Sequence, residues 1–185
     1  MRLFIGIPLP EEYQKMLASI RQEWEGRLKS KLAWTKPGNW HLTLKFLGEI
    51  QEDRLAGLED FMKNMSFQSF SLQGSGAGFF GSKGMYRVMW LGLGLDVKVL
   101  IALADRIDQS LAELGFERAQ RVFKGHLTLA RIRKFARNDP WNSVAKHISA
   151  QAWPVFEVKE VILWQSFLGP RGPRYEVAGS AVSLP

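Results

Sequence analysis

Apolar residues recur at helical spacing in two long stretches, one in each half of the chain. In residues 11–34 they are Tyr13, Met16, Leu17, Ile20 and Trp24, and in residues 97–115 they are Leu100, Leu103, Ile107, Leu111 and Leu114. Steps of three and four residues place side chains on one face of a helix, so both stretches predict amphipathic helices. Charged amphipathic stretches at 52–64 and 142–148 predict two further helices.

Short apolar runs around these helices predict strands, and their order repeats. Phe-Ile-Gly-Ile at 4–7 returns in pattern as Trp-Leu-Gly-Leu at 90–93, 86 positions later (90 − 4). Apolar runs at 67–72 and 155–164 close the two halves. We therefore interpret the chain as one domain, 1–185, built from two tandem β-α-β-α-β units at about 1–87 and 88–185. Two units are too few for a solenoid, so a two-lobed globule with approximate twofold symmetry is predicted.

A glycine-rich stretch at 74–84 interrupts this alternation. It lacks the Gly-x-x-x-x-Gly-Lys-Ser/Thr pattern of a phosphate-binding P-loop. We interpret it as a flexible turn, or as a lid over a cleft between the two lobes.

The tetrapeptide His-Leu-Thr-Leu occurs in both halves, at 41–44 and 126–129, 85 positions apart (126 − 41). It contains two of the three histidines of the chain. On a strand, residues i and i+2 face the same way, so His41 shares a face with Thr43, and His126 shares a face with Thr128. The leucines then anchor each strand to a core. Two such strands side by side would place two imidazoles and two hydroxyl groups around one small anion.

The composition fits one compact domain. A chain of 185 residues, 46% of them hydrophobic and 12% aromatic, can bury a substantial core. The absence of cysteine excludes disulfides, thiolate metal sites and a thiol nucleophile. Pro8 and Pro10 interrupt the apolar N-terminus before a signal peptide could form, and the longest apolar run, 88–95, is far shorter than the roughly 18 residues of a membrane span. We expect a cytoplasmic protein without a membrane segment.

The formal net charge is +7, and six cations flank the two tetrapeptides: Lys36, Lys45, Arg121, Lys124, Arg131 and Arg133. Lys45 is in phase with His41 and Thr43, so on an unbroken strand it would face the same cleft, and we predict that it binds substrate there. A cleft lined by one sign of charge attracts ligands of the other sign. Polyphosphate or nucleic acid is the natural candidate. A solvated basic face without any binding role is the competing explanation of the charge.

Two histidines beside a phosphate suit the opening of a cyclic phosphodiester. A neutral imidazole must take a proton from the attacking water, and a protonated one must give a proton to the departing sugar oxygen. Hydroxyl groups and cations would hold the non-bridging oxygens, and this scheme requires no metal and no cofactor. Packing alone would explain the leucines of the two strands, but it gives no reason for His-x-Thr on the opposite face of both.

Other candidate residues receive simpler interpretations. His147 has no counterpart in the other half and is interpreted as structural. Phe46 is out of phase with His41, so we expect it to pack in the core, unless the strand bends and lets the ring stack on a base. A zinc hydrolase would require three protein ligands, and a chain without cysteine or His-Glu-x-x-His is a weak contender.

The paired motifs resemble those of the two-histidine (2H) phosphoesterase superfamily. Three segments narrow the resemblance: Met-Arg-Leu-Phe-Ile-Gly-Ile at 1–7, Trp-His-Leu-Thr-Leu-Lys-Phe-Leu-Gly-Glu at 40–49 and Gly-His-Leu-Thr-Leu-Ala-Arg at 125–131. With Gln-Ser-Phe-Leu at 165–168, Gly172 and Tyr175, they are similar to the LigT-like (ThpR) branch. The resemblance covers essentially the whole chain, and both motifs are intact.

The resemblance implies an α+β fold of two lobes with pseudo-twofold symmetry, each an antiparallel sheet with outer helices, and a central active-site groove. It implies an RNA 2′,3′-cyclic phosphodiesterase that opens a terminal cyclic phosphate to a 2′-phosphomonoester, with 2′–5′ RNA ligation as the reverse chemistry. His41 would be the acid on the leaving 3′ oxygen, and His126 the base that activates water. Thr43 and Thr128 would bind the phosphate. Arg131 matches a family position that is often basic, although strand phase puts it opposite His126.

The implied substrates are RNA ends that carry a 2′,3′-cyclic phosphate, on tRNA fragments or oligonucleotides. We expect the protein to act on them as a monomer and without a cofactor. A non-catalytic module of the same fold that binds RNA ends or nucleotides is the alternative, and the intact His-x-Thr pairs favour the enzyme.

Overall fold

A computed structural model describes residues 1–170 and 172–184 of the chain. Within these residues, nine strands form one antiparallel sheet in the order β7-β4-β5-β6-β3-β1-β8-β9, with β2 paired to β6 beside this path. The strands are β1 (Arg2–Pro8), β2 (Lys31–Trp34), β3 (His41–Glu49), β4 (Phe70–Ser82), β5 (Met85–Leu95), β6 (His126–Lys134), β7 (Val155–Val158), β8 (Glu160–Gly169) and β9 (Gly172–Val182). The predicted α+β fold with an antiparallel sheet is confirmed.

The helices are α1 (Glu11–Trp24), α2 (Leu55–Asn64), α3 (Val97–Glu113) and α4 (Trp141–Ser149), with a short 3₁₀-helix, η1 (Glu52–Arg54), before α2. The first helix is shorter than predicted, because Gly26 takes a φ of 84° just after it and Lys31–Trp34 extends as β2 against β6. In the described part of the chain, no helix is long and apolar enough to cross a membrane.

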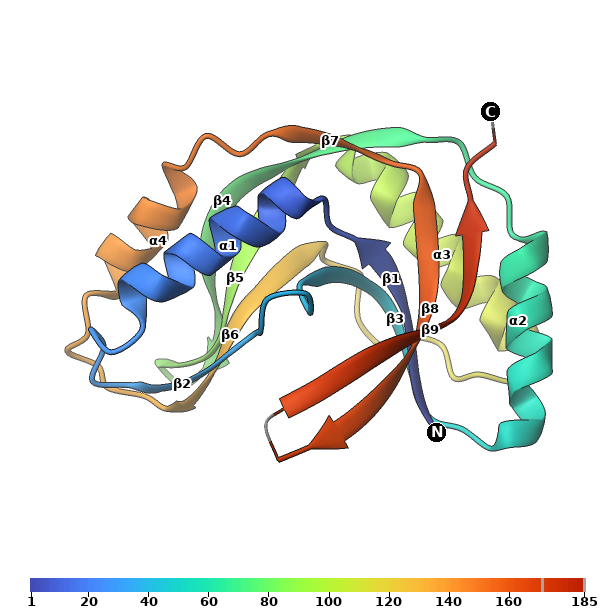
Figure 1. The fold of residues 1–185 in the computed structure, drawn as a ribbon, viewed down its shortest axis with the longest axis horizontal. Helices are drawn as coiled ribbons and strands as arrows, with labels where there is room; N and C mark the ends of the chain where they lie inside the picture. Colours follow the sequence, from blue (N-terminus) through green and yellow to red (C-terminus); the bar gives the residue numbers. More distant parts are fainter. Residues whose placement is uncertain (171, 185) are drawn as a thin grey trace.

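The two lobes interleave the two halves of the sequence (Figure 1). One lobe contains β1, β3, β8 and β9 and lies against α2 and α3, on the right of the view. The other contains β2, β4, β5, β6 and β7 and lies beside α1 and α4. Strand β8 of the second half pairs with β1 of the first, and β4 of the first half pairs with β5 of the second. The two lobes therefore do not correspond to the two tandem units, because each lobe contains strands of both halves.

Tyr13 of α1 shows how firmly the halves are joined. Its side chain is fully buried, and its ring stacks on Trp153 with 5.2 Å between ring centroids. The hydroxyl donates to the carbonyl oxygen of Pro154 (2.7 Å) and accepts from the backbone N–H of Gly74 (2.8 Å). A helix of the first half is thus part of the core beneath β4 and β7. The expected boundary near residue 87 falls inside β5.

The glycine-rich stretch forms most of β4 and the tight turn into β5 rather than a flexible turn or lid. The two strands are joined by Lys83 and Gly84, both with positive φ (52° and 73°), as a tight two-residue hairpin turn requires. Gly74 and Gly78 lie directly against Trp153 and Trp90, where an added Cβ would come within 2.6 Å of each ring. Glycine at these positions leaves room for the indoles, which explains a strand that its composition did not predict.

Candidate active site

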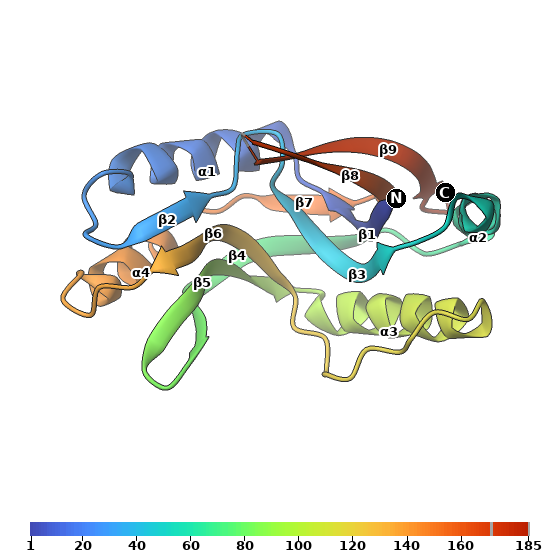
Figure 2. The same cartoon turned by 90° about the horizontal axis from the view of Figure 1, so that it is seen from below.

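The two His-Leu-Thr-Leu segments lie side by side at the centre of the sheet, where β3 and β6 meet. They run antiparallel and pair through Leu42 and Leu127, both with 0% of their surface exposed. The alternation of a strand puts the His and Thr side chains on the opposite face from these leucines. In Figure 2, β3 and β6 lie near each other at the centre of the view and extend from there to opposite sides, β3 to the right and β6 to the left.

His41 lies in an aromatic cage. Its ring centroid is 4.7 Å from that of Phe4, 5.4 Å from Trp164 and 5.3 Å from Tyr175. Nδ1 lies 2.7 Å from the carbonyl oxygen of Asn39, so it carries the proton and donates, and Nε2 lies 3.0 Å from the Thr43 hydroxyl. Burial among these groups disfavours the imidazolium and lowers the pKa of His41 to about 4.

His126 has the same backbone contact in more open surroundings. Its Nδ1 lies 2.8 Å from the carbonyl oxygen of Lys124, and the ring meets Phe80 edge to face at 4.8 Å between centroids. Burial lowers the pKa of His126, and the positive charge of Arg131 lowers it further. Arg131 also acts on Tyr175, whose pKa is raised by burial and held back by the guanidinium. This side chain thus lies near groups of both lobes.

A groove of about 770 Å³ opens over this part of the sheet. His41, Thr43, Thr128 and Arg131 are among its lining residues, and His126 flanks it two residues before Thr128. Four lining side chains and the flanking His126 can therefore offer two imidazoles, two hydroxyls and a guanidinium, which suits proton transfer at an anionic phosphodiester.

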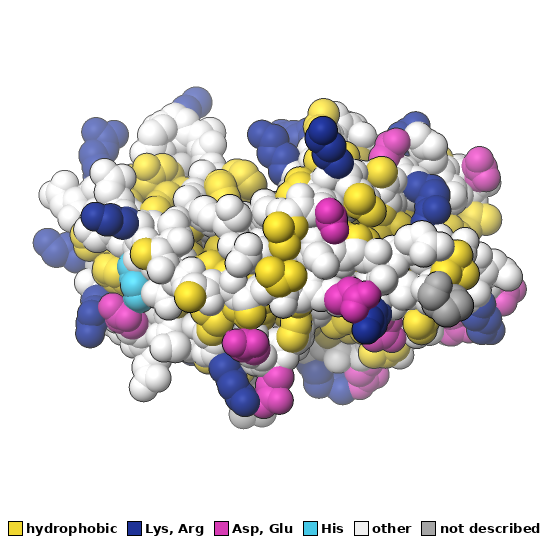
Figure 3. Space-filling model, turned by 90° about the horizontal axis from the view of Figure 1, so that it is seen from above, with side chains coloured by type: hydrophobic (Ala, Val, Ile, Leu, Met, Phe, Trp, Pro, Cys, Tyr) yellow, Lys and Arg dark blue, Asp and Glu magenta, His cyan; other side chains and the backbone are white. Residues whose placement is uncertain are grey.

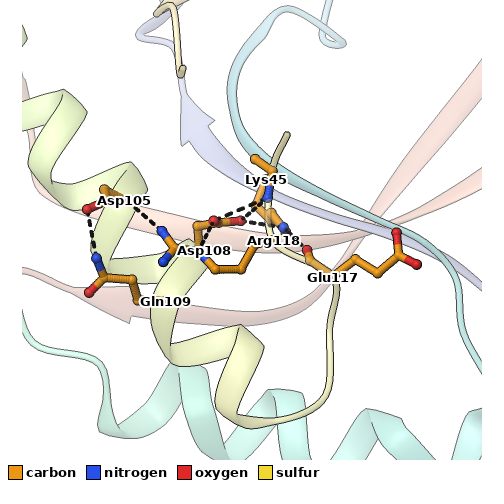
Figure 4. A network of polar contacts seen from close by, with 7 residues as sticks. Lys45, Asp105, Asp108, Gln109, Glu117 and Arg118 are labelled. Atoms are coloured by element: carbon orange, nitrogen blue, oxygen red, sulfur yellow. Dashed lines mark hydrogen bonds and ion pairs between the residues drawn. The ribbon is translucent and has the colours of Figure 1, made fainter. Parts of the chain in front are cut away.

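Lys45 does not face the groove, so the prediction for this residue is wrong. The pairing of β3 with β1 shifts register at Leu44, and this bulge turns Lys45 to the other face of the sheet. Only 9% of Lys45 is exposed, and its ammonium bonds to the carboxylate of Asp108 on α3 and to the carbonyl oxygen of Glu117 (Figure 4). The lysine therefore ties β3 to α3 instead of contacting substrate.

The Asp108 carboxylate is the shared acceptor at the centre of this buried network. Its carboxylate also accepts from Arg118 Nε (3.1 Å) and from the backbone N–H of Ala119 (3.1 Å). Burial raises the pKa of Asp108, but the bonds from two cations and one N–H outweigh it, so the net shift is downward. The network fixes the start of the segment that leads to Lys124, whose carbonyl oxygen orients His126.

The same bulge brings Phe46 into the groove. Its side chain is 67% exposed and lines the cavity, although strand phase predicted core packing. On β6 a matching register shift at Leu129 turns Arg131 to the face of His126. The prediction that strand alternation places Arg131 on the face opposite His126 is therefore wrong. Phe46 and Arg131 are 85 positions apart (131 − 46), like the histidines, so the two bulges repeat with the motif.

The remaining predicted residues divide between groove and periphery. Lys36 and Arg133 line the groove, whereas Arg121 and Lys124 are exposed on the segment before β6. His147 on α4 accepts a hydrogen bond from the Trp24 indole (2.8 Å), as a structural residue would. Among the described residues, no three His, Asp or Glu side chains gather where a metal ion could be held.

The sequence analysis missed the aromatic residues around both imidazoles. Phe4 lies on β1, Trp164 on β8, Tyr175 on β9 and Phe80 on β4, so four distant segments contribute. It also missed the two carbonyl groups, each two residues before its histidine. The tetrapeptides carried no signal for the aromatic residues, because these depend on which strands become neighbours. The carbonyl contacts are local, and they depend on the backbone conformation just before each strand.

Known proteins resemble this chain over nearly its whole length. The family described as LigT like phosphoesterase matches residues 7–90 and 95–175. An RNA 2′,3′-cyclic phosphodiesterase of Archaeoglobus fulgidus is 33% identical over 176 residues, covering 95% of this chain and 97% of the relative. Another, from Thermotoga maritima, is 31% identical and covers 96% of this chain and 92% of its own length.

Solved structures share the fold. A crystal structure of a Thermus thermophilus protein superposes with a TM-score of 0.79 at 26% identity, covering 98% of this chain and 97% of that one. The structure of E. coli LigT complexed with 3′-AMP gives a TM-score of 0.77 at 25% identity, with coverage of 98% and 97%. The chain therefore belongs to the LigT-like phosphoesterase family.

Proposed function

We propose that the protein is an RNA 2′,3′-cyclic phosphodiesterase, which opens a terminal cyclic phosphate to a 2′-phosphomonoester. The observation that carries this proposal is the pairing of β3 with β6, which sets both His-x-Thr pairs on one face beside a single groove. Relatives that match 95% or more of this chain bear that activity as their name. We propose action as a monomer, in the cytoplasm, on the ends of tRNA fragments or oligonucleotides.

The two imidazoles have the tautomer that the reaction needs. In each ring Nδ1–H donates to a backbone carbonyl, which leaves Nε2 for the reacting groups. His126 takes a proton from water as the water attacks phosphorus, and His41 gives a proton to the 3′ oxygen as its bond to phosphorus breaks. The 2′ ester bond stays intact, and the same steps with the 5′ hydroxyl of a second RNA in place of water would form a 2′–5′ linkage.

His41 must be protonated to act as the acid, yet burial holds its pKa at about 4 in the free protein. A bound cyclic phosphate carries a negative charge, and a negative charge nearby stabilises the imidazolium and raises its pKa. Substrate binding would thus favour the protonated form of His41, which is the form that acts as the acid. Thr43, Thr128 and Arg131 would hold the non-bridging oxygens, whose charge must be stabilised in the transition state, and the exposed ring of Phe46 offers a surface for the terminal base.

The test uses a short RNA with a 2′,3′-cyclic phosphate, in the presence of EDTA. We expect the wild-type protein to open the ring without added metal, and His41→Ala and His126→Ala each to lose about 10²–10⁴-fold in rate. His147→Ala, which removes a histidine far from the groove, is the matched control and should retain activity. Full activity in either groove variant would refute the two-histidine mechanism.

The same experiment separates the enzyme from a non-catalytic binder of RNA ends. A binder would retain the labelled RNA in a fluorescence anisotropy assay but leave the cyclic phosphate closed. If the wild-type protein bound the RNA without opening the ring, the protein would be a binding module and not an enzyme.

A further inference from the structure

The groove has two chemically different ends. After Thr43, β3 leads to Phe46, which lies near Phe4 with 6.1 Å between ring centroids. The cation at this end, Arg2, forms an ion pair of 3.1 Å with Glu49, so its charge is compensated. This end, defined by Phe46, Phe4 and the Arg2–Glu49 pair, is aromatic and close to neutral.

The opposite end is cationic. Because β6 runs antiparallel to β3, its residues after Thr128 extend away from Phe46 and bring Arg131 and then Arg133 to the groove lining. Lys31 lies at the start of β2, in phase with Ala33, which lines the groove and pairs with Arg131. Lys31 and Arg133 are both exposed, and neither forms an ion pair within the part of the chain that the structure describes.

Some cations elsewhere on the surface are compensated by a neighbouring carboxylate. On α1, Lys15 pairs with Glu11 and Arg21 with Glu25, each one helical turn apart. On the face shown in Figure 3, basic and acidic side chains are interspersed. Lys31 and Arg133 have no such partner among the described residues, and their position beside Arg131 extends the positive charge of the groove beyond that residue.

We propose that Lys31 and Arg133 form a subsite for the phosphate on the 5′ side of the terminal nucleotide. This inference rests on the proposed function, which places the cyclic phosphate beside the histidines. The base is attached to the ribose at C1′ and the 5′ carbon at C4′, on either side of the ring oxygen, so a base on Phe46 leaves the 5′ carbon on the side of the ribose toward β2 and the end of β6. Arg133 lies two residues beyond Arg131 on β6, at the end of the groove away from Phe46.

The subsite gives the protein a reason to prefer RNA ends over cyclic mononucleotides. A 2′,3′-cyclic mononucleotide can occupy the centre and the aromatic end, but it has no phosphate for Lys31 and Arg133. An oligonucleotide has one, and its contacts release counterions, so each contact adds about 0.7 to the slope of log affinity against log salt for a single strand.

The experiment compares three substrates with the same terminal adenosine: the 2′,3′-cyclic mononucleotide, a trinucleotide, and a trinucleotide with an uncharged methylphosphonate at the last linkage. For Lys31→Ala and Arg133→Ala we expect the ratio of kcat/KM for the trinucleotide to that for the mononucleotide to fall roughly three- to tenfold. The methylphosphonate should lower this ratio in the wild type and make it insensitive to both substitutions. Lys98→Ala, which removes an exposed cation on α3, is the matched control.

The outcomes distinguish this inference from the proposed function. Equal losses on all three substrates, or an unchanged ratio in both variants, would overturn the subsite while leaving the phosphodiesterase intact. If the wild type opened none of the substrates, the proposed function would fall, and anisotropy with a 2′-phosphorylated trinucleotide would still test the subsite. In that assay the affinity should fall in Lys31→Ala and Arg133→Ala but not in Lys98→Ala, and equal affinities would overturn it.

Discussion

The surroundings of His41 and His126 differ although the two tetrapeptides are identical. His41 lies among Phe4, Trp164 and Tyr175, and its pKa is lowered to about 4. His126 meets Phe80, flanks the groove, and has a smaller downward shift of its pKa to which Arg131 contributes. The tetrapeptide thus determines which face each imidazole occupies, whereas residues from other segments determine how readily it is protonated.

The loops that orient the two rings are also held differently. Asn39, whose carbonyl oxygen contacts His41, donates through its side chain to Pro173 on β9, and Gln14 of α1 donates to the carbonyl oxygen of Trp40. The segment before His126 is held by the charged network around Asp108. One imidazole is therefore positioned through neutral hydrogen bonds and the other through a segment that buried charges anchor.

The largest expected effect separates the roles of the two histidines. A 3′-thio substrate releases a thiolate that needs no proton, so His41→Ala, about 10²–10⁴-fold slower on the normal substrate, should recover most of its loss. His126→Ala should remain slow, because the attacking water still needs a base. Single-turnover rates on both substrates measure the difference. Selective recovery of the His126 variant would reverse the roles and leave the pairing intact.

The next effect contrasts Lys45 and Phe46, two neighbours that follow the β3 bulge and face opposite sides of the sheet. Lys45→Met leaves the buried Asp108 carboxylate without its lysine, so the free energy of unfolding should fall by about 3 kcal/mol. Phe46→Ala removes an exposed ring, so it should change stability little and raise KM for RNA instead. Urea unfolding and steady-state kinetics on both variants test this contrast. If the Lys45 variant had wild-type stability and a raised KM, Lys45 would contact substrate in the groove rather than stabilise the fold.

The same two bulges explain where the prediction from strand alternation succeeded and where it failed. Alternation correctly placed His41, Thr43 and their leucines, because a buried leucine on every second position leaves a clear pattern. It failed at Lys45, Phe46 and Arg131, because one extra residue in a strand reverses every later side chain without changing the composition. The interleaved lobes were not predictable either, since hydrophobic periodicity identifies a strand but not its partner.

Replacing the hydroxyls should cost less than replacing the imidazoles. Thr43→Val and Thr128→Val nearly preserve shape, and each should lose roughly 1.5–3 kcal/mol of transition-state stabilisation, or about one to two decades in rate. Only Thr43 lies within hydrogen-bond distance of an imidazole. In the free protein its hydroxyl donates to the neutral ring, so Thr43→Val should also raise the pKa of His41 there and shift the corresponding limb of the pH profile of kcat/KM upward. Equal profiles for both variants would contradict this contact.

The smallest expected effect is a change of the free energy of unfolding with pH, which reports how strongly burial disfavours the charged form of each histidine. The pKa of His41 is about 4 in the folded protein and about 6.5 in the unfolded chain, so as pH falls below 6.5 the unfolded chain binds the proton first and stability is lost until about pH 4. Between pH 7.5 and pH 5 this loss amounts to about 2 kcal/mol for His41. His41→Asn lacks it, so urea unfolding should show the variant gaining that amount relative to wild type over this interval, while His126→Asn gains less. Equal gains for both variants would show that the aromatic cage does not distinguish the two imidazoles, whatever their roles in catalysis.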